Sequence, residues 1–379
     1  MIDPPSRPIT LFLAGDVMTG RGIDQILPYP GQPEIFEPCL RSATDYIALA
    51  EAARGPIERA THFTDPWGDA LAILDQCAPD ARIINLETAV TRRGRPWPGK
   101  DIHYRMHPEN LPCLTGAKVD LCTLANNHVL DWGRTGLIET LDQLHRHGIR
   151  TAGAGRNAHE AWQPAVLDRP DAGRIVVFAI GCPSSGIPPE WAARDDTPGI
   201  ARLADLSVQT LEDIGEHLDR CRKPGDTIIV SIHWGGNWGD AIPESHHAFA
   251  HGLIDRAGVT VVHGHSSHHP LGFEIYRDRP IFYGCGDLLN DYEGIRGFER
   301  YRPDLALLYL VRLTDTGLQH LELVPLHRSG FRLHGAKREQ AEWLRQKLTQ
   351  NSLGLRGPLG IDGQGHLHWY PTHDTSELL

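Results

Sequence analysis

The chain has 379 residues with a formal net charge of -11 at neutral pH, and 40% of its residues are hydrophobic. This length and composition are typical of a globular protein with a sizeable core, in one large domain or two modest ones. An acidic balance argues against nucleic acid and against an anionic membrane surface, because both are bound through basic faces. We therefore expect neither a nucleic acid nor a membrane as partner.

The sequence has no uninterrupted apolar run of about 18 residues, so we expect no transmembrane span. Its beginning, Met-Ile-Asp-Pro-Pro-Ser-Arg-Pro, lacks the apolar region of a signal peptide, and we expect a cytoplasmic protein. The seven cysteines contain no Cys-x-x-Cys pair, which disfavours a disulfide framework or a zinc ribbon. The 22 histidines are an unusual number, and imidazole is the commonest metal ligand in proteins.

Short apolar runs rich in Val, Ile and Leu indicate buried strands, and helical patterns lie between them. In chain order the strands are Ile9–Ala14, Ala81–Leu86, Leu121–Leu124, Ile175–Ile180, Thr227–Ile232, Val259–Val262 and Pro280–Tyr283. The helices are Asp65–Cys77, Gly133–His147, Ser207–Cys221 and Ser245–Ala257. This alternation predicts an α/β layered fold with much of the sheet parallel.

Other parts of the sequence have a less regular pattern of apolar and polar residues. Residues 25–64 and 92–110 have the character of loops, with several prolines. Two more strand patterns, Ala306–Leu313 and His320–Val324, precede one charged amphipathic helix over residues 336–350. We interpret residues 1–330 as one domain and residues 331–379 as a C-terminal extension with one helix.

Six of the seven predicted strands end in carboxylates, side-chain amides or histidines. In open α/β sheets ligands bind at the carboxyl ends of the strands, so we expect these side chains at one rim. The segments are Gly15–Arg21, Asn85–Thr88, Ala125–Gly133, His233–Asn237, His263–Pro270 and Gly284–Asp287. Imidazole and carboxylate together favour a borderline divalent cation such as Mn, Fe, Co or Zn. The pattern predicts a metal site with one ion, or with two that share a carboxylate.

Each fragment also has a purely structural interpretation. Asp16 could cap the helix that follows it. Asp131 could cap the predicted helix Gly133–His147, and this is as plausible as a role in orienting His128. His233 could be a hydrogen-bonded core histidine. The four histidines within His263–His269 are harder to explain by packing, which favours ligand function for that turn. Whether the first and the last of these four coordinate a metal stays open.

Together these segments resemble the signature of the CapA-like proteins, which are named for capsule poly-γ-glutamate synthesis and belong to the calcineurin-like metallophosphoesterase superfamily. The resemblance runs in the right order from about residue 9 to about residue 290. It implies a four-layer α/β/β/α metallophosphoesterase-like sandwich with the site at one edge. It also implies one or two divalent metal ions (Mn, Co, Fe, Zn or Mg) with these ligands: Asp16, Glu87, Asn127, His233, His265 and His268.

The resemblance implies further roles around the metal ligands. It makes His128 the acid/base group and Asp131 the partner that orients it. Arg21 and Arg105 resemble the family's substrate contacts, and either could hold a carboxylate through its bidentate guanidinium fork.

Three features depart from the family pattern. Asn237 stands where the family usually has Glu, and Asp287 stands where it often has Asn. Capsule-type members usually carry an N-terminal membrane anchor, and we expect none here. These departures favour a function other than capsule export or simple phosphatase activity.

We therefore predict a metal-dependent isomerase that epimerises a peptide, as some soluble CapA-like proteins are associated with lasso-peptide pathways. A metal near the C-terminus of such a peptide would acidify an α-proton by stabilising the enolate. His128 is the first candidate base, and Asp287, His265 or His269 could be the opposite acid. Trp234 and neighbouring tryptophans would suit an apolar peptide end, although packing explains tryptophans equally well.

Two alternatives stay open. The chain could be a metal-dependent phosphoesterase, a hydrolase in which His128 protonates the leaving oxygen. It could instead be a component of capsule poly-γ-glutamate synthesis, including a metal-stabilised scaffold without catalytic activity.

Overall fold

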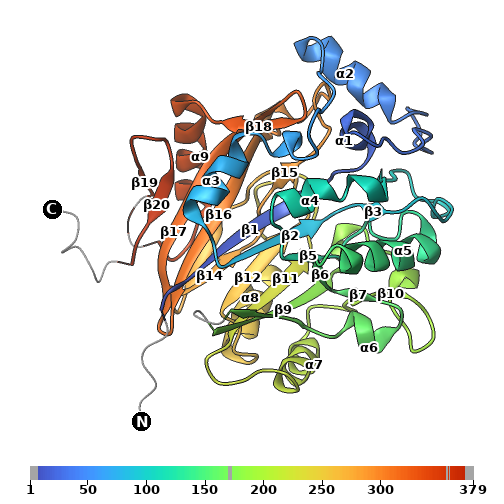
Figure 1. Cartoon of the computed structure of the whole chain (residues 1–379). Coiled ribbons are helices and arrows are strands. Elements are labelled where there is room, and N and C mark those ends of the chain that lie inside the picture. Colours follow the sequence, from blue (N-terminus) through green and yellow to red (C-terminus); the bar gives the residue numbers. More distant parts are fainter. Residues whose placement is uncertain (1–6, 170–172, 356, 358, 372–379) are drawn as a thin grey trace.

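Two sheets packed face to face form the centre of the computed structural model, which describes residues 7–169, 173–355, 357 and 359–371. Helices cover the outer faces of both sheets (Figure 1). No helix in this described part of the chain is long and apolar enough to cross a bilayer.

The larger sheet, called sheet A, has ten strands and is mixed. Its order is β19-β20-β17-β16-β1-β2-β5-β6, with β15 paired to β1 and β18 paired to β17. The strands β1, β2, β5 and β6 run parallel, whereas β16 and β17 are antiparallel neighbours. The bounds are β1 Ile9–Val17, β2 Ala81–Leu86, β5 Leu121–Thr123, β6 Arg150–Ala152, β15 Asp287–Leu289, β16 Leu305–Thr314, β17 Gly317–Ser329, β18 Arg332–Gly335, β19 Gly360–Ile361 and β20 Leu367–Trp369.

The smaller sheet, called sheet B, has six strands in the order β13-β14-β12-β11-β9-β8. Its central strands β9, β11, β12 and β14 are parallel. The bounds are β8 Ala165–Arg169, β9 Gly173–Gly181, β11 Thr227–His233, β12 Val261–His265, β13 Phe273–Tyr276 and β14 Arg279–Phe282. Two small ladders pair β3 (Ala89–Val90) with β4 (Arg105–Met106) and β7 (Ala154–Gly155) with β10 (Gly199–Ile200).

The helices complete four layers, so the predicted α/β/β/α sandwich is confirmed. One hydrophobic cluster joins sheet A to α1 (Arg21–Ile26), α3 (Asp69–Cys77), α4 (Pro112–Gly116) and α5 (Gly133–Arg146). Another joins sheet B to α7 (Val208–Asp219) and α8 (Glu244–Asp255). The other helices are α2 (Thr44–Arg54), α6 (Ala158–Ala161) and α9 (Arg338–Asn351).

Helix α7 shows how the sequence produces these outer layers. The side chain of Ser207 accepts a hydrogen bond from the backbone N–H of Thr210 and so caps the first turn. Leu211, Ile214 and Leu218 recur three and four residues apart, and all three are buried against sheet B. The helix is therefore held by one apolar stripe, with its polar face toward solvent.

Strand β1 contributes to two cores because successive side chains point to opposite faces of a sheet. Leu11 and Leu13 pack between the sheets, together with Ile229 of sheet B. Phe12 and Ala14 pack on the helix side of sheet A. Burial on both faces explains why this strand is a continuous apolar run in the sequence.

The described residues beyond 330 contact sheet A and the core between the sheets. Strands β18 and β20 both pair with β17, and Leu344 and Leu348 of α9 pack into the cluster between the sheets. The sequence pattern predicts the helix but not these strands. The domain boundary at residue 330 stays a prediction, and residues 372–379 lie outside the described residues.

Replacing Leu11 by Ala should lower the free energy of unfolding by about 2–5 kcal/mol, because it leaves a cavity between the sheets. Urea unfolding followed by circular dichroism measures this loss. Val208→Ala is the control: its side chain is 51% exposed, so a change within about 0.5 kcal/mol is expected. Equal effects of the two substitutions would contradict the assigned core.

Candidate functional site

The C-terminal ends of strands from both sheets meet at one place and bring the predicted ligands together. Oxygen ligands come from sheet A, at or just after its strands, and imidazoles come from sheet B. The sheet A residues are Asp16, Glu87, Asn127 and Asp287, and the sheet B residues are His233, His265 and His268. All seven are buried except Asn127, which is partly buried.

A bulge in β1 directs the Asp16 side chain into this meeting point. The register of β1 against β2 shifts between Ala14 and Asp16, so Gly15 is the extra residue. A Cβ atom on Gly15 would lie 1.9 Å from the carbonyl oxygen of Gly286. Only glycine therefore lets β1 pass this close to the turn before β15.

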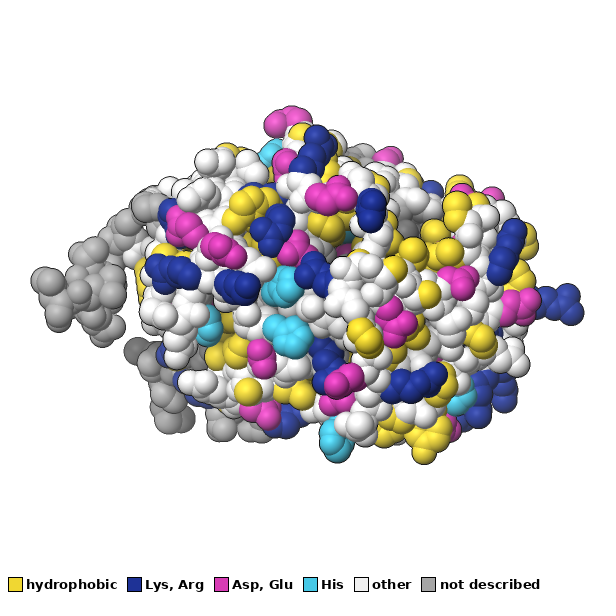
Figure 2. Space-filling model, turned by 90° about the horizontal axis from the view of Figure 1, so that it is seen from above, with side chains coloured by type: hydrophobic (Ala, Val, Ile, Leu, Met, Phe, Trp, Pro, Cys, Tyr) yellow, Lys and Arg dark blue, Asp and Glu magenta, His cyan; other side chains and the backbone are white. Residues whose placement is uncertain are grey.

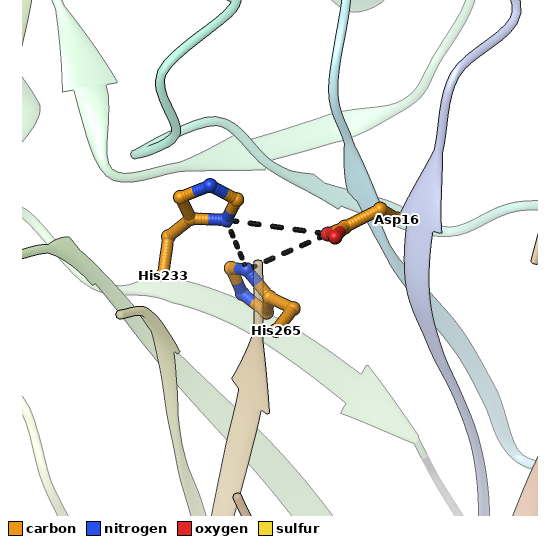
Figure 3. A group of neighbouring side chains, drawn as sticks. All are labelled: Asp16, His233 and His265. Atoms are coloured by element: carbon orange, nitrogen blue, oxygen red, sulfur yellow. Dashed lines mark hydrogen bonds and ion pairs between the residues drawn. The ribbon is translucent and has the colours of Figure 1, made fainter. Parts of the chain in front are cut away.

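Asp16, His233 and His265 form the first group of potential metal ligands. One ligand atom from each lies within 4.8 Å of the others, and the carboxylate and both rings point toward one another in Figure 3. The Nδ1 atoms of the two histidines are 2.8 Å apart. They lie 4.0 and 3.8 Å from Asp16 Oδ1, respectively. Two imidazoles and a carboxylate converging in this way suit a transition-metal cation.

A chain of hydrogen bonds fixes which nitrogen of His265 faces this group. His263 Nε2 donates to the carbonyl oxygen of Ala14 at 2.8 Å, and burial lowers the pKa of His263 to about 4. Ser231 Oγ lies 3.2 Å from His263 Nδ1 and 2.8 Å from His265 Nε2. The Ser231 hydroxyl donates to Thr123 Oγ1 at 3.3 Å and contacts His265 through Nε2. Nδ1 is therefore the nitrogen of His265 that faces Asp16. His263 supports a ligand and does not face the group itself.

Asp16, His268 and Asp287 form a second group of potential ligands, which shares Asp16 with the first. His268 Nδ1 lies 2.9 Å from Asp287 Oδ1, and His268 Nε2 lies 3.3 Å from the hydroxyl of Tyr292. The side-chain amide of Asn290 donates to the other oxygen of Asp287 at 2.7 Å. Asp287, predicted as an acid/base candidate, therefore stands where a ligand of a second ion would stand.

Glu87 and Asn127 extend the first group on the side of sheet A. Asn127 Oδ1 lies 3.0 Å from His233 Nε2, and Glu87 Oε1 lies 3.7 Å from the same nitrogen. The buried Glu87 Oε2 receives no hydrogen bond from any N–H or O–H of the described residues. A buried carboxylate oxygen left in this way costs about 1–3 kcal/mol or more, and a cation would remove that cost.

Burial and neighbouring charges shift the pKa values of the cluster's acidic and imidazole groups. Burial and then the charge of Asp287 raise the pKa of Asp16 to about 7. Burial and then the charge of Asp16 raise the pKa of Glu87 well above its usual range. Burial lowers the pKa of both His233 and His265 well below its usual range. His268 differs from the other two imidazoles: burial lowers its pKa, but the charge of Asp287 outweighs burial, so its pKa is raised. The cluster thus offers two neutral imidazoles, the imidazole of His268 beside Asp287 and crowded carboxylates, a donor set that fits one or two divalent metal ions.

His128 adjoins the ligands and is held by two charged groups. Its Nε2 lies 3.7 Å from Glu87 Oε1, and its Nδ1 lies 2.7 Å from Asp131 Oδ2. Lys100 Nζ also lies 3.0 Å from Nδ1, so Asp131 and Lys100 hold one side of the ring while Nε2 faces Glu87 of the cluster. Lys100 Nζ lies 2.7 Å from the other oxygen of Asp131. Asp131 therefore orients His128, and the N-cap position of α5 is Trp132 instead.

The guanidinium fork of Arg21 is occupied by carboxylates of this chain. Its Nε donates to Asp291 at 3.1 Å and its Nη1 donates to Glu37 at 3.0 Å. The rings of Tyr46 and Tyr104 lie 3.7 and 4.1 Å from the guanidinium carbon. The predicted contact with a substrate carboxylate through this fork would require breaking buried ion pairs, which is costly.

Arg105 and Trp234 also have partners within the chain. Arg105 stacks on Trp132 at 3.7 Å and donates to the carbonyl oxygen of Gln32. Trp234 is 2% exposed, and its Nε1 donates to the carbonyl oxygen of Tyr283 at 2.9 Å. Trp234 belongs to the core between sheet B and its helices, so packing accounts for it. A substrate could contact the Trp234 side chain, as predicted, only if that side chain were more exposed than it is in this structure.

A hollow of about 160 Å³ opens beside His268 and Tyr292. One wall is the stacked pair Trp238 and Phe298, whose ring centroids are 4.1 Å apart. Two basic side chains are among the described residues that line it, and both are already paired: Arg21 with Glu37 and Asp291, and His268 with Asp287. The hollow therefore suits an uncharged part of a substrate whose reacting bond lies at the ligand cluster.

Sequence reasoning gave no role to Lys100 or Tyr292. Lys100 lies in an irregular loop, where only the contact with Asp131 reveals its place in the site. Tyr292 had a stronger signal, because it ends the run Asp287–Tyr292, which follows the last strand end of the motif and contains three further polar side chains. His269, left open as a ligand, lies 2.8 Å from Lys347 Nζ and outside both ligand groups.

Comparisons with known proteins show the family to which the chain belongs. The model of a family described as bacterial capsule synthesis protein PGA_cap matches residues 10–292. A probable polyglutamine synthesis accessory protein of Mycobacterium tuberculosis is 45% identical over 354 residues, which are 92% of this chain and 93% of that protein. Two more distant relatives, each matching 84% of this chain, are a capsule biosynthesis protein CapA of Bacillus anthracis (22% identical, 67% of its length) and a PGA biosynthesis protein CapA of Bacillus subtilis (23% identical, 72% of its length).

Gly15→Ala should abolish binding of divalent metal at the cluster, because the added methyl group collides with Gly286 and displaces Asp16 or the neighbouring Asp287. Calorimetric titration with Mn²⁺ measures the loss. Gly236→Ala is the matched control, since a Cβ there meets nothing within 4 Å. Unchanged Mn²⁺ binding by folded Gly15→Ala protein would show that Asp16 is not a ligand.

Proposed function

Because the chain belongs to the bacterial capsule synthesis protein family PGA_cap, we propose that it is a metal-dependent hydrolase serving the synthesis of a glutamine- or glutamate-based polymer. The observation that carries the proposal is the His128–Asp131 pair, with His128 Nε2 directed at Glu87 of the ligand cluster. A scaffold needs the ligands but not an oriented imidazole beside them. We infer the kind of polymer from the names of the relatives, and we infer hydrolysis from the position of His128 beside the ligand cluster.

Divalent ions at such a cluster polarise a substrate oxygen and acidify nearby water. His128 accepts a proton from the attacking water through Nε2, while Asp131 holds the ring through Nδ1. The water oxygen bonds to the substrate carbonyl carbon, the carbon–nitrogen bond breaks, and His128 returns the proton to the leaving nitrogen. Lys100 keeps Asp131 in place.

The hollow beside His268 favours a neutral polymer over an anionic one. Its aromatic wall offers stacking surface to amide side chains, and the paired Arg21 leaves no free guanidinium for a carboxylate. On the face shown in Figure 2, Lys and Arg side chains alternate with Asp and Glu and form no field of one sign. We therefore propose that polyglutamine is a better substrate than polyglutamate.

Epimerisation of a peptide residue, the function favoured by the sequence alone, is a second candidate. It needs two groups that exchange protons on opposite faces of an α-carbon. His128 lies beside Glu87, and the Tyr292 hydroxyl lies beside His268, which belongs to the other ligand group. This pair supports the candidate, whereas the relatives' names favour polymer synthesis.

One incubation separates these functions. The protein with Mn²⁺ in deuterated water is given a polyglutamine peptide, poly-γ-glutamate or a generic phosphodiester, and products are analysed by mass spectrometry. We expect shortened polyglutamine chains, slower cleavage of poly-γ-glutamate and no reaction after chelation. Deuterium at an α-carbon of an intact chain would replace our proposal with epimerisation. Turnover of the phosphodiester alone would replace it with phosphoester hydrolysis.

His128→Gln should lower kcat by about 10²–10⁴-fold, the range for loss of a general acid/base group. Its Mn²⁺ stoichiometry should stay that of the wild type, because His128 is not in either ligand group. His147→Ala is the control, since His147 is exposed at the end of α5 and belongs to neither ligand group. Full activity in His128→Gln would show that His128 is not the proton-transfer group.

A further inference from the structure

A second cluster of metal-ligating side chains lies on β17 and β20, at the far side of sheet A from β6. The two strands are antiparallel, and Glu322 pairs with His368 in register. Their neighbours Leu321, Leu323 and Trp369 are buried toward the other sheet. Because side chains alternate, Glu322 and His368 must project from the opposite, outward face.

The outward face places three potential ligands together. His320 lies two residues before Glu322 and so shares its face, and its Nε2 is 3.0 Å from His368 Nδ1. One ligand atom from each of the three residues lies within 4.8 Å of the others. The ring of Tyr370 stacks on His320 with centroids 4.3 Å apart, which limits rotation of that imidazole.

Further carboxylate and imidazole groups orient these three. His368 Nε2 lies 3.1 Å from Asp362 Oδ2, and since the carboxylate only accepts, the proton of His368 is on Nε2. Its Nδ1 lone pair therefore points toward His320, the arrangement in which a carboxylate orients a ligating histidine. His366 Nδ1 lies 2.7 Å from one oxygen of Glu322, which leaves the other oxygen available.

Accessibility and charge both allow an ion to enter. The side chains of Glu322 and His368 are each 20% exposed, so the cluster is open to solvent. Burial and then His368 lower the pKa of His320 to about 4, so its ring is neutral near pH 7. No residue of this cluster belongs to the site at the strand ends, and β16 separates β17 from β1.

We propose that His320, Glu322 and His368 bind a divalent transition-metal ion that fastens strand β20 to β17. Two imidazoles and one carboxylate favour zinc or a similar borderline cation over magnesium or calcium. The ion would bridge the last described strand to the body of sheet A. This site is independent of the proposed hydrolysis.

Metal counting tests the proposal with Zn²⁺ as the probe. After equilibrium dialysis, His320→Ala and Glu322→Gln should each hold one zinc ion per chain fewer than the wild type. His334→Ala should match the wild type, because His334 is an exposed histidine on β18 of the same sheet. Equal counts in all four folded proteins would overturn the proposal and leave a hydrogen bond between the two imidazoles.

A second readout follows the strand itself. Zn²⁺ should slow amide hydrogen exchange over residues 360–369 in the wild type, because binding to the native state stabilises it against local opening. The effect should disappear in Glu322→Gln, whose side chain keeps its volume. Slowing that persists in this variant would show that zinc acts elsewhere.

Discussion

The two sheets have to end at the same place, because the oxygen ligands lie on sheet A and the imidazoles lie on sheet B. Neither sheet can assemble the cluster alone. The apolar layer between them, with Leu11 and Leu13 opposite Ile229, sets their separation and therefore the distance from Asp16 to His233. The apolar core between the sheets, which lies away from the polar residues, therefore controls the geometry of the site.

The same arrangement concentrates charge that the protein must then balance. Asp16, Glu87 and Asp287 are all buried; burial raises the pKa of Asp16 and of Glu87, and the charge of Asp287 raises both further. Burying several carboxylates together is unfavourable unless positive charge joins them. His233 and His265 are held neutral and cannot supply that charge, and His268 is already paired with Asp287. The site is built to be completed by cations, and its stability and its chemistry depend on the same groups.

The sequence predicts the fold and the members of the cluster, since both follow from local patterns. Apolar runs mark the strands, and polar residues directly after them identify the rim. Local patterns do not show which histidines face the ligand group. His263 is held away from that group by its hydrogen bond to the carbonyl oxygen of Ala14, 249 positions away in the sequence. Arg21 likewise forms its ion pair with Asp291, 270 positions away, while its role as a substrate contact stays a prediction. Such pairings appear only once the chain is folded, and the functional roles of the site residues stay predictions.

The position of β1 in sheet A has a consequence for the order in which the protein can form. Strand β1 precedes the other described strands of sheet A in the chain, and β2, which follows it, can pair with one of its edges early. Its other edge pairs with β15 and β16, which are made only when most of the chain exists. Contacts of such long sequence separation form slowly. One edge of this apolar strand therefore stays unpaired until β15 and β16 have been synthesised. Chaperones that cover such an edge would matter more here than in a fold whose neighbouring strands follow one another in the sequence.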